Sequence, residues 1–199
     1  MSGAVRPADN PFSSCKMDAL PYLGGPASWR DLGRRIDDLG GRVAIVGAKG
    51  RGKTTLLEEF AEVLTPPVTL IRITGADPCP FRTARSRIPK PLDGSHTILL
   101  DGAEQLGEVA WRCFLFATRG AGRLVAACHR PGRLPTLLSC STDPELLRTL
   151  VARLAPDDAV ILEPHLPALF HRHAGNIREC LRDLYDVYAG RQQGQRSNV

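Results

Sequence analysis

The residues from Gly47 to Thr54 have the types and spacing of a phosphate-binding loop. They read Gly-Ala-Lys-Gly-Arg-Gly-Lys-Thr and fit the pattern G-x-x-x-x-G-K-[ST]. In such a loop the unpaired amides of a glycine-rich turn and of the first helical turn converge and favour negative charge. Lys53 is then expected to reach the β- and γ-phosphates, and the Thr54 hydroxyl to bind Mg²⁺. The run therefore predicts a polyphosphate site.

Every position of this loop is expected to line the site. Glycines allow backbone angles and a close approach to phosphate that a side chain would block. The two charged residues in the middle of the loop are expected to be solvated and not catalytic. The predicted nucleotide-binding residues are Gly47, Ala48, Lys49, Gly50, Arg51, Gly52, Lys53, Thr54 and Thr55.

A strand and a helix must hold the loop. Residues 42–46 are apolar and β-branched, as in a buried parallel strand, and the loop begins directly after them. Residues 53–64 carry apolar side chains at i, i+3, i+4 and i+7, which predicts a helix. Pro66-Pro67 forbids its continuation. A chance glycine-rich turn is the alternative, but strand, spacing and helix all agree with a phosphate-binding loop.

A carboxylate follows a second buried strand. Residues 97–101 form an apolar run that ends in Asp101, where phosphate-loop proteins hold a carboxylate beside Mg²⁺. Thr54 and Asp101 are therefore the predicted metal residues. Glu104 is the only nearby carboxylate that could orient an attacking water, and the alternative is a first-turn residue that interacts favourably with the helix dipole. The sequence supports phosphate binding more directly than hydrolysis.

Composition indicates a soluble globular protein. The 199 residues are 43% hydrophobic and 24% charged, with a formal net charge of +5. No apolar stretch approaches the roughly 20 residues that cross a bilayer, and the start of the chain does not resemble a secretory signal. We therefore expect a cytoplasmic location and no membrane contact. The six cysteines form no C-x-x-C pair and are expected to be reduced thiols, with Cys113, Cys128 and Cys180 in apolar patterns typical of buried thiols.

Part of the positive charge is concentrated in one proline-containing stretch, residues 82–90. It contains Arg82, Arg85, Arg87 and Lys90 and few acids, and it is interpreted as an exposed loop. A basic loop could contact nucleic acid or an acidic partner, but no aromatic interleaving or nucleic-acid module accompanies it. A solvated loop is the favoured interpretation.

Strand and helix patterns alternate through the first two thirds of the chain. Further strands are predicted at 68–73, 123–128 and 137–140, so the fold class is α/β, a P-loop core with a parallel sheet flanked by helices. From Thr142 three helix patterns follow in succession, which predicts a small helical lid. The predicted divisions are an N-terminal arm (1–26), a nucleotide-binding core (27–141), a helical lid (142–190) and a disordered tail (191–199).

Three stretches together resemble the AAA+ ATPases, particularly the branch of origin-recognition, clamp-loader and transposition ATPases. Residues 47–54 resemble Walker A, residues 98–106 resemble Walker B, and residues 175–181 resemble sensor 2. The resemblance implies ATP and Mg²⁺ as cofactors, and it implies that Arg178 reaches the γ-phosphate. It also puts His129 where the family carries the polar residue of sensor 1. The alternatives are a solvated Arg178 and a structural His129 at a strand end.

The chain departs from the family pattern at three places, the first of which is His129, where the family normally has Asn, Ser or Thr. Gly102 follows Asp101 where the family usually has glutamate, which leaves Glu104 as the substitute. The connection between the fourth and fifth strands omits the helix that often bears an arginine finger, although Arg130 or Arg133 could serve. The resemblance also suggests that the segment Asn10-Pro11-Phe12 passes over the adenine, and a hydrophobic anchor explains Phe12 equally well.

These observations lead to one main functional hypothesis and two alternatives. The main hypothesis is an AAA+-like ATP·Mg²⁺-dependent conformational switch with slow or partner-stimulated hydrolysis, in which Lys53, Asp101, Glu104, His129 and Arg178 carry the chemistry. The alternatives are a P-loop kinase that uses the basic stretch as a clamp, and a nucleotide-binding scaffold without turnover. A protein partner, nucleic acid and oligomerisation all stay open. The sequence does not disclose the biological process.

Overall fold

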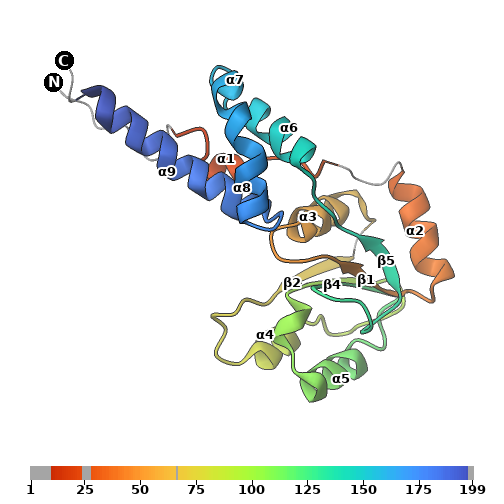
Figure 1. Ribbon diagram of the computed structural model, residues 1–199. Helices are drawn as coiled ribbons and strands as arrows, with labels where there is room; N and C mark the ends of the chain where they lie inside the picture. Colours follow the sequence, from red (N-terminus) through yellow and green to blue (C-terminus); the bar gives the residue numbers. More distant parts are fainter. Residues whose placement is uncertain (1–9, 24–27, 66, 197–199) are drawn as a thin grey trace. The chain divides into compact units, whose positions relative to one another are not determined.

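The computed structural model describes residues 10–23, 28–65 and 67–196 (Figure 1). The chain divides into two compact units. The sheet unit lies within residues 24–48 and 52–140, and the helical unit lies within residues 1–23, 49–51 and 141–199. The first nine residues of the predicted arm, Pro66 of the predicted helix stop and residues 197–199 of the predicted tail lie outside the described residues.

The sheet unit is built on five parallel strands in the order β2-β3-β4-β1-β5. The pairing aligns buried residues across the three central strands, with Val43 opposite Val125 and Val125 opposite Leu99. The α/β prediction with a parallel sheet flanked by helices is confirmed. The strands are β1 (Arg42–Val46), β2 (Val68–Arg72), β3 (Thr97–Asp101), β4 (Arg123–Cys128) and β5 (Thr136–Ser139).

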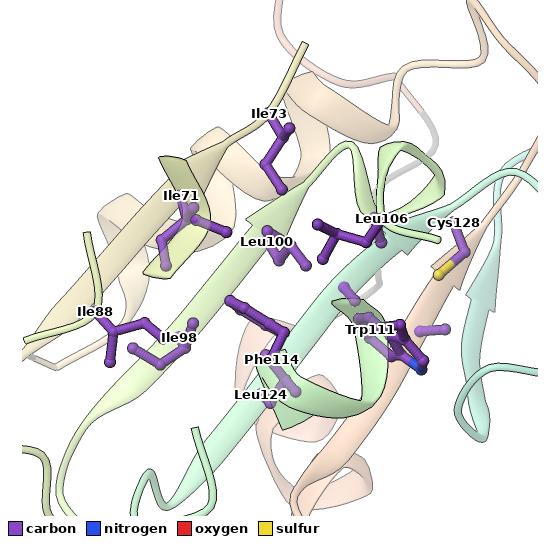
Figure 2. Packing of buried hydrophobic residues seen from close by; sticks show 14 of the residues in the cluster. Ile71, Ile73, Ile88, Ile98, Leu100, Leu106, Trp111, Phe114, Leu124 and Cys128 are labelled. Atoms are coloured by element: carbon purple, nitrogen blue, oxygen red, sulfur yellow. The ribbon is translucent and has the colours of Figure 1, made fainter. Parts of the chain in front are cut away.

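One face of the sheet is covered by α4 (Pro80–Ser86) and α5 (Glu108–Ala117). Trp111 and Phe114 stack with ring centroids 6.1 Å apart and point from α5 toward the side chains of β3 and β4 (Figure 2). A 3-10 turn, η2 (Ala103–Gln105), lies between β3 and α5. The chain makes this turn first, and the helix begins at Glu108.

The other face carries α2 (Trp29–Asp38) and α3 (Lys53–Val63). Ser28 caps α2, since its hydroxyl accepts a hydrogen bond from the Asp31 amide. Trp29 stacks on Phe60 of α3 with ring centroids 5.7 Å apart. Leu56, Leu57 and Phe60 are buried, so α3 presents the apolar stripe that its periodicity predicts. The helix that follows the phosphate loop is therefore fixed by its packing.

The helical unit contains α1 (Ser14–Asp18) and the C-terminal helices. Phe12 is fully buried among them, 6.2 Å from Tyr188 between ring centroids, and Asn10 donates a hydrogen bond to the Tyr185 carbonyl oxygen at 3.0 Å. Phe12 is therefore a hydrophobic anchor in the core of the helical unit, the alternative that the sequence leaves open for it. The other helices are α6 (Pro144–Leu154), α7 (Ala159–Leu162), η3 (Glu163–His165), α8 (Leu166–Arg172) and α9 (Ile177–Arg196).

Three further expectations need correction. The basic stretch after β2 is not a loop throughout, because α4 begins there with Pro80 in its first turn and buries Ala84. The tail predicted as disordered from residue 191 is helical to Arg196, since Arg and Gln are good helix formers. Cys113 is exposed on α5, whereas Cys128 and Cys180 are buried as expected. No helix in the described part of the chain is long and apolar enough to cross a membrane.

Candidate phosphate-binding site

The loop leaves β1 at a point where a side chain would not fit. The Gly47 amide donates to the Cys128 carbonyl oxygen of β4 at 3.1 Å, and a Cβ on Gly47 would lie 2.7 Å from the Cys140 carbonyl oxygen. Gly52 caps α3 in the left-handed region with φ 76°, which favours glycine. The first helical hydrogen bond runs from the Leu56 amide to the Gly52 carbonyl oxygen, so the amides before Leu56 precede the helical ladder. Such amides are the donors that bind anions at helix N-termini.

Lys53 lies inside this loop. Its Nζ donates to the carbonyl oxygens of Gly47 at 2.6 Å and Ala48 at 2.9 Å, and the residue is only 7% exposed. Burial lowers the pKa of Lys53, and the nearby carboxylates of Glu104 and Asp101 oppose that shift. The ammonium group is thus a buried positive charge held by the loop backbone.

Thr54 and Asp101 meet beside the lysine. The Thr54 hydroxyl donates to Asp101 Oδ2 at 2.8 Å, which joins the start of α3 to the end of β3. The position of Asp101 follows from the parallel register, in which it is opposite Arg72 at the edge where the strands end. A hydroxyl and a carboxylate oxygen are ligands that Mg²⁺ accepts. The two residues predicted to hold the metal are therefore adjacent.

Glu104 and His129 form a second polar pair. His129 Nε2 lies 3.1 Å from Glu104 Oε1, so the turn after β3 meets the end of β4. The other carboxylate oxygen, Glu104 Oε2, is buried and has no hydrogen-bond partner among the described residues. A buried acceptor without a partner is costly unless a donor reaches it.

Arg133 holds the turn that carries Glu104. Its guanidinium donates to the carbonyl oxygens of Ala103 at 2.5 Å and Leu106 at 2.7 Å, and it lies 5.2 Å from the centroid of the Trp111 ring. The sequence suggests Arg133 as an arginine finger acting on another subunit. Its donors instead bind this chain's own backbone, so we correct that suggestion. The sequence carries no signal for this contact, since the two segments meet only through the sheet.

Gly102 is required by the close approach of Ile73, the residue that follows β2. It has φ 85°, and a Cβ there would lie 2.1 Å from the Ile73 carbonyl oxygen. A glutamate directly after Asp101, as in the family that the chain resembles, would therefore collide with backbone. The glycine explains why Glu104, two positions later, is the carboxylate of this turn.

The tip of the loop belongs to the helical unit. Arg51 Nη1 donates to Thr142 Oγ1 at 2.9 Å and Arg51 Nη2 to the Ala174 carbonyl oxygen at 3.1 Å, so Arg51 is not simply solvated as expected. A Cβ on Gly50 would lie 1.7 Å from Asn176 Oδ1, the same oxygen that caps α9 by accepting from the Glu179 amide at 3.3 Å. The loop tip thus lies against the first turn of α9.

The remaining residues predicted for the site are exposed or only partly buried. Ala48 and Lys49 are exposed, and Thr55 is partly buried in the first turn of α3. Arg178 is exposed in the first turn of α9, in the helical unit. Thr142 also holds this region, because its hydroxyl donates to the Gly175 carbonyl oxygen at 2.7 Å. In the described part of the chain no three His, Cys, Asp or Glu side chains form a metal-binding cluster.

No protein-family model and no curated protein matches this chain. Among solved structures, it is similar to a Signal Transduction ATPase with Numerous Domains (STAND) protein with a tetratricopeptide repeat sensor from Pyrococcus horikoshii. The identity is 15% and the TM-score 0.40, over 80% of this chain and 30% of that one. It is also similar to a structure of Drosophila ORC bound to DNA, at 11% identity and a TM-score of 0.38, over 85% of this chain and 66% of that one. The chain thus spans less than two thirds of either structure, and neither likeness carries an argument about function.

Proposed function

We propose that this protein binds ATP with Mg²⁺ and acts as an AAA+-like, nucleotide-dependent switch. The observation that carries the proposal is the adjacency of three groups at one end of the sheet: the buried Lys53 ammonium, the Thr54 hydroxyl and the Asp101 carboxylate. A cation inside a ring of loop backbone, beside an oxygen pair suited to Mg²⁺, fits a triphosphate better than a neutral ligand. Lys53 and the loop amides would hold the phosphates, and Thr54 and Asp101 the metal.

The same edge of the sheet supports slow hydrolysis. Bound ATP supplies an electrophilic γ-phosphoryl group. Glu104 has one carboxylate oxygen beside His129 and one buried oxygen without a partner, so it is the group that would orient a water and accept its proton. His129 is a positioning residue for that carboxylate, and Arg133 positions the whole turn.

Arg51 supports the switch part of the proposal. It is part of the loop and binds Thr142 and the Ala174 carbonyl oxygen, so a change in the loop backbone on phosphate binding is transmitted to the segment before α9. Arg178 follows in the first turn of α9, where we propose that it senses the γ-phosphate. A ligand shifts such an equilibrium only by its differential affinity for the two states.

Calorimetric titration of ATP and ADP in the presence of Mg²⁺ tests the proposal. We expect wild-type protein to bind ATP and Lys53→Met to lose at least about tenfold in affinity, since a charged hydrogen bond contributes roughly 1.5–3 kcal/mol. Lys49→Met is the matched control, because Lys49 is an exposed lysine of the same loop, and its affinity should change little. Equal loss in both variants, or no heat from any purine triphosphate, would refute the phosphate site.

The same titration separates the switch from its alternatives. Arg178→Ala should reduce the preference for ATP over ADP, and an unchanged preference would remove the sensing role. Glu104→Gln should slow phosphate release without weakening ATP binding. Binding without any release indicates the scaffold, and transfer to a small acceptor with little release indicates the kinase.

A further inference from the structure

The outer face of α5 carries an apolar stripe that no other element covers. Val109 is 76% exposed, Phe116 is 67% exposed, and the exposed Cys113 lies between them. Their spacing of i, i+4 and i+7 puts all three on one side of the helix. The opposite side, with Trp111 and Phe114, already faces the sheet. The side chains of this stripe therefore do not contribute to the core of the sheet unit.

Positive charge surrounds this stripe. Arg119 lies over the Phe116 ring, 3.9 Å from its centroid, and Arg112 is exposed on the same side of the helix. Helix α4 packs against α5 and contributes the exposed Arg82 and Arg85. Among the described residues only Arg112 of these four makes an ion pair, with Glu108. The α4–α5 face, as we call this surface, thus combines the apolar stripe of α5 with exposed arginines of both helices.

The helical unit carries a surface of the opposite kind at α7. Val160 is 79% exposed and Ile161 is 57% exposed. Asp157 and Asp158 precede them and Glu163 follows. Glu163 pairs with Arg148 at 3.0 Å, but neither aspartate makes an ion pair within the described part of the chain. This α7 knob is apolar at its centre and acidic around it.

We infer that the α7 knob of one copy docks on the α4–α5 face of a second copy. The two surfaces match in both respects: aliphatic side chains meet an apolar stripe, and Asp157 and Asp158 meet unpaired arginines. A nucleic acid would satisfy the arginines, but its phosphates would leave Val109 and Cys113 without an apolar partner. A second copy of this chain supplies both kinds of contact.

This contact joins two different surfaces, so it is heterologous. In a pair, one copy still has a free α7 knob and the other still has a free α4–α5 face. Further copies can therefore add until a ring closes, or a chain grows, unless one of these surfaces is blocked. The inference does not depend on nucleotide binding, since all the residues involved lie outside the phosphate loop.

Sedimentation of the full chain over a range of concentrations tests the inference. We expect the wild-type mass to rise with concentration, and Phe116→Glu and Ile161→Glu each to remain monomeric when alone. Val63→Glu is the matched control, because Val63 is 50% exposed on α3 and should leave association unchanged. Thermal unfolding checks that the exposed substitutions preserve the fold.

Mixing the two variants gives the sharper result. Phe116→Glu keeps its α7 knob and Ile161→Glu keeps its α4–α5 face, so an equal mixture should form one-to-one complexes and nothing larger, because the remaining surfaces both carry glutamate. A monomeric mixture would overturn the inference. So would self-association of Ile161→Glu alone, which would indicate pairing of two α5 helices.

A disulfide cross-link tests the same contact independently, because it traps the complex covalently even when association is weak. In a Cys15→Ser, Cys79→Ser background, Val160→Cys should form an intermolecular disulfide with the exposed Cys113 on mild oxidation. A dimer linked through two Cys113 residues, or no cross-link, contradicts the docking. Monomeric wild-type protein that binds an oligonucleotide and loses it on Phe116→Glu would assign the face to nucleic acid instead.

Discussion

At the scale of single residues, Gly102 shows how packing decides which side chain can do chemistry. The left-handed backbone and the approach of the Ile73 carbonyl oxygen exclude any side chain directly after Asp101. The carboxylate of this turn is therefore Glu104, which the 3-10 turn brings to His129. In the proposed hydrolysis, the carboxylate that orients the water thus lies two positions after Gly102.

Restoring the family pattern should therefore damage the protein. We predict that Gly102→Glu lowers the free energy of unfolding by at least about 2 kcal/mol, because the left-handed conformation alone costs roughly 1–2 kcal/mol and the collision adds to it. Gly107→Glu is the control, since a Cβ at Gly107 has no atom within 4 Å. Urea denaturation of both variants measures the difference. Equal unfolding free energies for Gly102→Glu and Gly107→Glu would contradict this prediction, because they would show that the backbone at Ile73 can move to make room for a side chain.

At the scale of elements, the turn between β3 and α5 is held by a side chain from outside it. We predict that Arg133→Ala lowers the free energy of unfolding by about 2 kcal/mol, since two charged hydrogen bonds to backbone are lost. It should also slow phosphate release more than it weakens ATP binding, because Glu104 loses its support. Arg130→Ala is the matched control, an exposed arginine three residues away. If phosphate release slows equally in Arg133→Ala and Arg130→Ala, Arg133 does not position Glu104.

The elements also show what could be predicted from the sequence. Local signals are sufficient to predict β1, the phosphate loop and α3, because the apolar run, the glycines and the helical period all lie within residues 42–64. The short α4 and α7 were missed because seven and four residues are too few to establish a period. The sequence could not choose between the two explanations of Phe12, because the residues that bury it lie far along the chain. In the site, Thr54 and Asp101 were predicted as neighbours, but the Arg133 contacts have no sequence signal.

At the scale of the whole molecule, the stability of the sheet unit should fall in acid because the Arg123–Asp37 ion pair is lost. Arg123 at the start of β4 donates to Asp37 at the end of α2 at 2.8 Å and 2.6 Å. These hydrogen bonds lower the pKa of Asp37 below its ordinary value of 3.8. A carboxyl whose pKa is lower in the folded state contributes stability above its unfolded pKa and loses it as pH falls.

We therefore predict that Asp37→Asn costs at most about 1 kcal/mol at neutral pH, since the pair is exposed to solvent. The difference in unfolding free energy from the wild type should shrink as pH falls from about 3.8 toward the lower pKa of folded Asp37. Chemical denaturation across this range measures it. Asp38→Asn should keep the wild-type pH dependence, because Asp38 is exposed and does not bind Arg123. A difference that grows in acid would contradict the assignment.

The burial of Phe12 within the helical unit has a consequence for how the chain is made. Asn10 binds the backbone of Tyr185, 175 residues later, while the strands of the sheet lie between residues 42 and 139. On the ribosome the sheet can therefore assemble as soon as its last strand has emerged, since domains fold during synthesis. Phe12 stays exposed to chaperones and proteases until the final helix leaves the exit tunnel. Residues 10–12 therefore precede the sheet in synthesis but can pack only after α9 has been made.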